Sequence, residues 1–116
     1  MAGITYTAKG VKKEILFDFD KDTATSTLRI MSPGDVILKI TLEVTEVFAA
    51  TKVITIGTPA DNTKYVKTTN TDLTTIGVYE ISQYYKVLAG ETLAFYASGA
   101  SATGAGNIFV ELLQNN

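Results

Sequence analysis

The most regular alternation of apolar and polar side chains lies in residues 36–45, directly after the sequence Ser-Pro-Gly-Asp. The alternating apolar residues are Val36, Leu38, Ile40, Leu42 and Val44. The residues between them are polar, with Ile37 as the one apolar exception. Because successive side chains of a strand point to opposite faces, this pattern predicts a strand with one buried and one solvent face. We expect it to reach residue 48 and to be the central strand.

The dipeptide Pro33-Gly34 predicts a type II turn before that strand, because proline fixes φ and glycine accepts a positive φ. Shorter strands are expected at 4–8, 11–19, 25–30, 52–56, 78–81, 84–88, 92–97 and 107–114. They are rich in threonine, valine and isoleucine, and no run has a convincing helical period. Short strands with frequent turn signals predict an all-β protein, built as an antiparallel sandwich or a small barrel.

The last expected strand, residues 107–114, is apolar on both faces. One face carries Ile108, Val110 and Leu112, and the other carries Phe109 and Leu113 around Glu111. A strand that is apolar on both faces must be covered on both. Two interpretations stay open: the second cover is another copy or a partner, or the strand lies at the centre of a lopsided sandwich.

Length and composition fit one globular domain, residues 1–116. The 116 residues are 46% hydrophobic and 19% charged, which is enough apolar material for one core. A net charge of -2 gives no footprint for nucleic acid, and we expect no membrane span. Without cysteine or histidine there are no thiolate or imidazole metal ligands and no histidine catalysis, and folding in a reducing cytoplasm is favoured. The N-terminus lacks the pattern of a signal peptide.

Three groups of side chains could carry chemistry, and each has a simpler interpretation. Asp18, Asp20 and Asp22 are spaced as in a calcium loop, but Thr23 and Arg29 stand where that loop needs glycine and glutamate. We therefore expect a solvated hairpin turn there and no metal site. Possible acid–base carboxylates are Glu43, Glu46, Glu80, Glu91 and Glu111, which fall on polar faces or in turns. Possible sugar-binding aromatic residues are Tyr79, Tyr84, Tyr85, Phe95 and Tyr96. The small residues at 98–106 predict a flexible hairpin loop.

Residues 33–114 carry a series of short motifs in a distinctive order. They are Gly34-Asp35-Val36, residues 53–58 before Ala60-Asp61, Asp72-Leu73-Thr74 with Gly77-Val78-Tyr79, residues 89–93, and Gly104-Ala105-Gly106 before Phe109-Val110-Glu111. In this order the chain resembles small bacteriophage structural proteins with a jelly-roll fold.

That resemblance implies a non-enzymatic virion protein without catalytic residues, cofactor or metal. The expected function is capsid decoration or cementing by a homotrimer that binds the major capsid protein or another virion protein. The expected location is the virion, assembled in the host cytoplasm. The alternative is a receptor- or carbohydrate-binding module of a phage tail or fibre. Residues 1–10 are a possible N-terminal arm, and the expected interface residues are Ile4, Tyr6, Ile108, Phe109, Val110, Leu112 and Leu113.

Overall fold

The structure is a computed structural model that describes residues 11–114. This part of the chain contains seven β-strands and one short 3-10 helix. They are β1 (Val11–Asp20), β2 (Ser26–Met31), β3 (Val36–Glu46), β4 (Val53–Gly57), η1 (Thr68–Asn70), β5 (Gly77–Lys86), β6 (Glu91–Ser98) and β7 (Ala105–Gln114). No helix in the described residues is long and apolar enough to cross a membrane.

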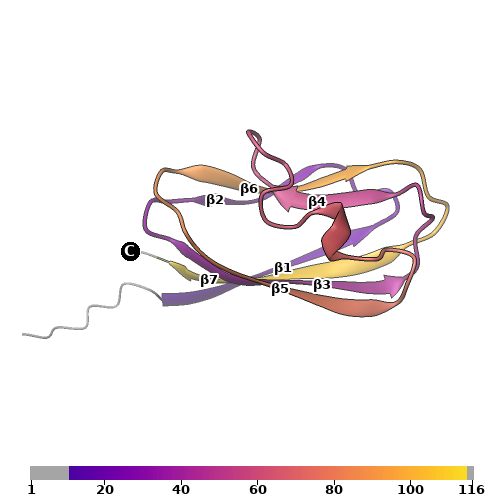
Figure 1. The fold of residues 1–116 in the computed structure, drawn as a ribbon, viewed down its shortest axis with the longest axis horizontal. Coiled ribbons are helices and arrows are strands. Elements are labelled where there is room, and N and C mark those ends of the chain that lie inside the picture. Colours follow the sequence, from indigo (N-terminus) through magenta and orange to yellow (C-terminus); the bar gives the residue numbers. More distant parts are fainter. Residues whose placement is uncertain (1–10, 115–116) are drawn as a thin grey trace, which may run out of the picture.

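The strands form two antiparallel sheets that pack face to face (Figure 1). Sheet A has the order β1-β7-β3-β5, and sheet B has the order β2-β6-β4. Strand β1 pairs with β7, β2 with β6 and β3 with β5, as if one long hairpin had been rolled up. The innermost pair is completed where Val66 bridges back to Ile56 of β4. This nested pairing is that of a jelly roll in which a single bridge replaces the eighth strand. The predicted all-β sandwich is confirmed.

The core lies between the two sheets and uses one face of each strand. Strands β3 and β7 contribute Ile40, Leu42, Val44, Ile108, Val110 and Leu112, all with no exposed surface. Sheet B contributes Leu93 and Phe95 of β6, which also have no exposed surface. The Phe95 ring lies 5.2 Å from that of Phe17 and 5.3 Å from that of Phe19, so aromatic contacts join β6 to β1.

Strand β3 departs from the predicted register at its beginning. Ile37 has no exposed surface, whereas Val36 and Leu38, which were predicted for the buried face, are only half-buried. The pairing of β3 with both neighbours shifts between Ile37 and Lys39. A β-bulge at this point inserts one extra residue and reverses the alternation. The apolar exception in the pattern is therefore a core residue, and the prediction holds from Ile40 onward.

The turn before β3 is the predicted type II turn. Gly34 has φ of 92°, and the Asp35 N–H donates to the Ser32 carbonyl at 3.1 Å. The buried Asp35 carboxylate accepts the Ser32 N–H at 3.0 Å. Two further backbone bonds of 2.7 Å join Gly34 and Asp35 to Val87, so the turn is clasped to the end of β5.

Strand β5 is a single strand, where two short strands separated at Ser82-Gln83 were predicted. The irregularity lies one residue later, at Tyr84, whose φ is 48°. This residue opposes the β3 bulge, and the alternation of exposed and half-buried side chains continues through it. The irregularity at this residue is therefore local, and β5 continues through it as one strand.

Two connections that were predicted as hairpins instead cross from one sheet to the other. Residues 21–25 lead from β1 in sheet A to β2 in sheet B, and residues 99–104 lead from β6 back to β7. The second connection is bonded to the loop after β3: Ser101 Oγ accepts the Ala49 N–H at 2.8 Å, and Thr103 Oγ1 donates to the Val47 carbonyl at 2.8 Å. It is therefore anchored at several points along its length.

Candidate interaction surface

The outer face of sheet A carries exposed apolar side chains, and it includes two of the predicted interface residues, Phe109 and Leu113. Leu16 of β1 is 62% exposed and pairs directly with Phe109 of β7. Two rows further on, Leu113 of β7 pairs with Val36 of β3, and all three of Phe109, Leu113 and Val36 are half-buried. Directly paired residues on one face lie close enough for side-chain contact. The face therefore carries two separate apolar pairs, Leu16 with Phe109 and Leu113 with Val36. The row between them holds Glu14, Glu111 and Lys39.

The structure divides the predicted interface residues of β7 between two faces. Ile108, Val110 and Leu112 are fully buried against sheet B, so a partner seated on the outside would not touch them. Phe109 and Leu113 point to the outer face. Strand β7 lies between β1 and β3. This is the central position that the second interpretation of its two apolar faces required. Ile4 and Tyr6 lie outside the described residues.

Charged side chains lie between and beside these two apolar pairs. Lys39 of β3 donates to the Glu80 carboxylate of β5 at 3.1 Å. This hydrogen bond, with the nearby charges of Glu80 and Glu111, raises the pKa of Lys39. Glu111 of β7 is the direct cross-strand neighbour of Glu14 of β1. Glu111 also lies directly opposite Lys39 of β3, so it has a like charge on one side and an opposite charge on the other.

A second polar cluster is partly buried and joins residues 64 and 65 to β5 and to the start of β6. Lys64 donates to the Tyr85 hydroxyl at 2.8 Å and to the Glu91 carboxylate at 2.9 Å, and the Tyr65 hydroxyl donates to the same carboxylate. Lys64 also lies 4.4 Å from the centre of the Tyr85 ring. Burial, helped by Glu91, raises the pKa of the Tyr65 hydroxyl.

This cluster ties the segment 58–66, which we call the strap, to β5 of sheet A and to β6 of sheet B. Gln83 Nε2 adds a 2.8 Å bond to the Tyr65 carbonyl, and the backbone of Tyr65 and Val66 bonds to Ile56. Every polar group named here forms its hydrogen bonds within the cluster, so these groups serve to hold the strap in place. Sequence reasoning considered Glu91 and Tyr85 separately and missed Lys64, because nothing in the local pattern indicates a contact across 27 residues.

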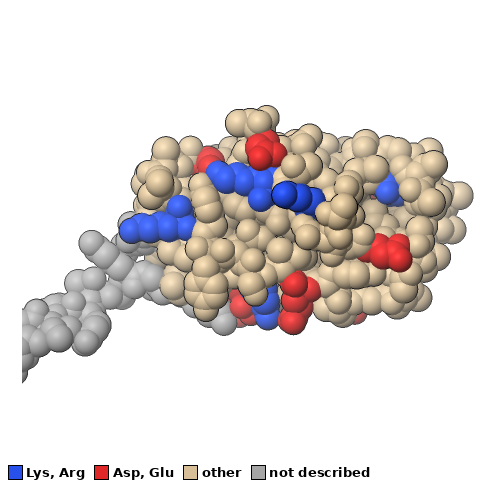
Figure 2. All heavy atoms as spheres, viewed as in Figure 1, with Lys and Arg blue, Asp and Glu red and all other residues tan. Residues whose placement is uncertain are grey.

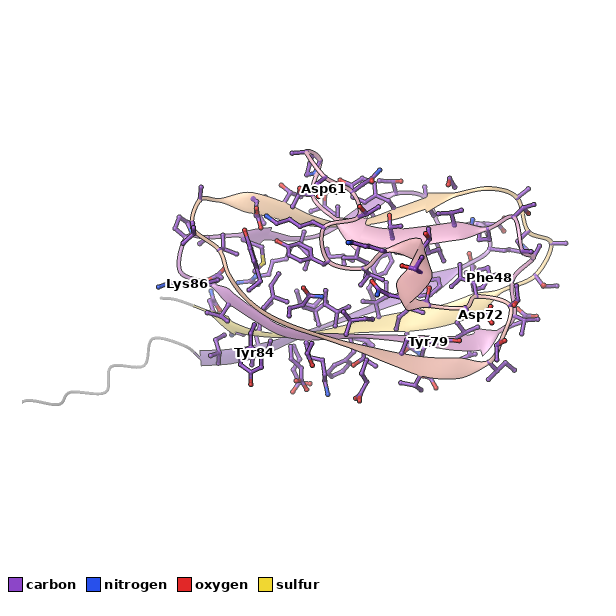
Figure 3. All side chains as sticks on the ribbon, in the orientation of Figure 1. Phe48, Asp61, Asp72, Tyr79, Tyr84 and Lys86 are labelled. Atoms are coloured by element: carbon purple, nitrogen blue, oxygen red, sulfur yellow. The ribbon has the colours of Figure 1, made fainter. Side chains whose placement is uncertain are left out.

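The predicted aromatic residues do not form a common ligand-binding surface. Phe95 is in the core and Tyr85 in the cluster with Lys64, while Tyr96 belongs to sheet B. The Tyr79 hydroxyl donates to the Asp72 carbonyl at 2.9 Å. Tyr84 alone of these is strongly exposed, at 79%, and points away from the sandwich (Figure 3).

Asp20, one of the acidic candidates, and Asp72 are used in local structure. Asp20 Oδ1 accepts the Asp22 N–H at 2.8 Å, and this bond lowers the pKa of Asp20. Asp72 Oδ1 accepts both the N–H and the hydroxyl of Thr74, which lowers the pKa of Asp72. Asp72 borders a hollow of about 340 Å³ beside Lys52 and Leu73. Carboxylates held ionised in this way are poor general acids. Among residues 11–114 no group of acidic side chains is placed to hold a metal ion.

The chain folds like chains of two bacteriophage capsids. The first is in the acidic stable capsid structure of Helicobacter pylori bacteriophage KHP30, with a TM-score of 0.73 and 14% identity; the match covers 93% of this chain and 91% of that chain. The second is in the capsid asymmetric unit of cyanophage Pam1, with a TM-score of 0.69, 14% identity and coverage of 98% and 92%. At this identity the likeness establishes the fold alone. No protein-family model and no curated protein matches the sequence.

Proposed function

We propose that the protein is a non-enzymatic structural component of a bacteriophage particle that attaches to the assembled capsid as a decoration or cement protein. The observation that carries this proposal is the match to two capsid chains over more than nine-tenths of every chain involved. A match of this extent relates one whole small sandwich to another. It differs from the detection of a common domain inside a larger protein.

The proposed mechanism is binding to the assembled lattice. A protein that binds the assembled lattice and not its free subunits stabilises the lattice by mass action. The outer face of sheet A, with Leu16 and Phe109, offers the apolar contact area. We further propose a trimer, because three linked copies make each later contact with the lattice effectively intramolecular. Multi-angle light scattering should then report about three chain masses, and a stable monomer at all concentrations would remove the trimer from the proposal.

The rival function, carbohydrate or receptor binding on a tail or fibre, has less support. The aromatic residues that would stack on a sugar are divided among the core, the strap cluster and two separate surfaces. A stacking platform needs aromatic rings gathered on one accessible face.

A particle map tests the proposal directly. Particles purified from cells that encode the chain should contain it in many symmetrically arranged copies, seen as sandwich-shaped density on the capsid by cryo-electron microscopy. Particles made without it should assemble but lose their contents at a lower temperature, and added purified protein should restore the difference. Density only in the tail, or absence from the particle, would refute the capsid assignment.

A further inference from the structure

The outer face of sheet A has an excess of negative charge. Its described carboxylates include Glu14, Asp18, Glu43, Glu80 and Glu111, which alternate with inward-facing residues along their strands. The described lysines of this face are Lys39, bonded to Glu80, and Lys86 at the far end of β5. We call this surface the acidic face. Figure 2 shows charged side chains of both signs along its rim, below β5 and β3.

The most exposed apolar pair of the acidic face lies within its carboxylates. Leu16 and Phe109 are cross-strand neighbours, and Asp18 and Glu14 flank Leu16 along β1. Glu111 follows Phe109 on the same face of β7 and lies between Glu14 of β1 and Lys39 of β3. Three carboxylates therefore border one apolar pair. An apolar centre with a charged rim is the usual anatomy of a protein interface.

A second copy of the chain is a poor occupant of this surface. Two copies related by a two-fold axis would place the same patch against itself. Each carboxylate of the rim would then approach carboxylates of the other copy, which is unfavourable where water is excluded. A partner with positive charge would instead place opposite charges against this rim.

We propose that the acidic face docks a different protein that presents an apolar side chain flanked by lysine or arginine, with that side chain seated against Leu16 and Phe109. This proposal deepens the proposed function, on which it rests for the partner's place in a particle. It assigns the contact to one face and states the chemistry that the partner must have.

The first test uses purified full-length protein and a short peptide of alternating lysine and leucine as the probe. The triple variant Glu14→Gln, Asp18→Asn, Glu111→Gln should bind the probe about tenfold more weakly than the unchanged protein. The control triple, Asp22→Asn, Asp61→Asn, Asp72→Asn, changes the net charge equally on other surfaces and keeps the Oδ1 acceptors that Asp61 and Asp72 provide. It should bind within about twofold of the unchanged protein. Equal weakening in both triples would overturn the proposal, because binding would then follow total charge alone.

The second test identifies the natural occupant by crosslinking. The chain has no cysteine, so Leu16→Cys introduces one unique attachment point for a thiol-linked photocrosslinker. Ile30→Cys is the matched control, because Ile30 is an exposed aliphatic residue of edge strand β2 in the other sheet, 75% exposed against 62% for Leu16. On particles, position 16 should crosslink to another protein beside a lysine or arginine, and position 30 should not.

Three results separate this inference from the proposed function. Crosslinks from position 16 to another copy of this chain would overturn the inference and leave the capsid role intact. Crosslinks from position 30 in place of position 16 would also overturn it. If particles lack the protein, the proposed function fails, and the peptide comparison still decides whether the acidic face prefers a basic, apolar partner.

Discussion

The outer faces of the two sheets differ in what covers them. On sheet B, Thr55 and Ala94 point outward along their strands yet are only 4% exposed. The strap explains this, because a side chain added at Gly57 would meet the Asp61 carbonyl oxygen at 2.3 Å. On sheet A, the outward Leu16 and Val78 are 62% and 58% exposed. The chain thus covers part of one sheet itself and leaves the other open.

The difference follows from where the chain places its one long irregular segment. Residues 58–76 stand between β4 and β5 and include the strap, whose tip at Asp61 projects above sheet B (Figure 3). Sheet A has no comparable insertion in the described residues, since β1, β7, β3 and β5 continue into short crossings. The chain's own loop thus covers the β4 side of sheet B, whereas Ile30 of the edge strand β2 stays 75% exposed. Sheet A carries apolar side chains that only another molecule would cover.

The largest expected effect tests which side chains of β3 belong to the inner face of sheet A. Ile37→Ala should lower the free energy of unfolding by about 2–5 kcal/mol, because it opens a cavity at a fully buried position. Leu38→Ala, one residue later on the half-exposed side of the bulge, should cost less than about 1 kcal/mol. Urea unfolding of both variants measures this. The reverse order would mean that β3 follows simple alternation without the bulge.

The sequence predicted the sandwich, most strand positions and the Pro33-Gly34 turn, because these depend on local alternation and local φ preferences. It misplaced the residues around Ile37, since a bulge depends on the pairing of β3 with two other strands. Alternation separated Phe109 and Leu113 from Ile108, Val110 and Leu112, but it could not tell which of these two faces sheet B covers. The acidic face was invisible because Glu14 and Glu111 meet only through the pairing of the first and last described strands.

A smaller effect is expected where the strap presses on sheet B. Gly57→Ala should cost about 1–3 kcal/mol, because the new methyl group must displace backbone atoms of Asp61 and Asn62. Gly90→Ala is the matched control, since its nearest contact would be the Met31 carbonyl oxygen at an ordinary 3.5 Å. The Gly57 variant should also speed hydrogen exchange in the strap. If the two variants have equal stability, the strap does not hold the outer face of sheet B closed.

The strap should also loosen at high pH. Burial and the Glu91 carboxylate raise the pKa of Tyr65 above its ordinary value of 10.0, so the folded state keeps a proton that the unfolded chain releases. The stability from this group is complete below about pH 10 and falls as the pH rises further. Tyr65→Phe removes the titrating group, so its free energy of unfolding should fall less between pH 9 and 11 than that of the unchanged protein. Parallel curves for the two proteins would contradict the assignment.

The smallest effect on folding is expected from the segment that precedes sheet A. The core of the described residues is built from side chains between Ile15 and Leu112, so both sheets already face each other without residues 2–9. Their alternation, with Ile4 and Tyr6, offers little apolar area. Deleting them should leave the melting temperature nearly unchanged, and should weaken co-sedimentation with particles stripped of the protein if the segment contacts the same partner as the acidic face.

The control is the Leu16→Ser variant, which should also melt normally and co-sediment poorly because its exposed side chain contributes to contact and not to the core. If the deleted protein instead unfolds at lower temperature while its folded fraction still attaches fully, residues 2–9 belong to the sandwich and the lattice-anchor hypothesis is wrong.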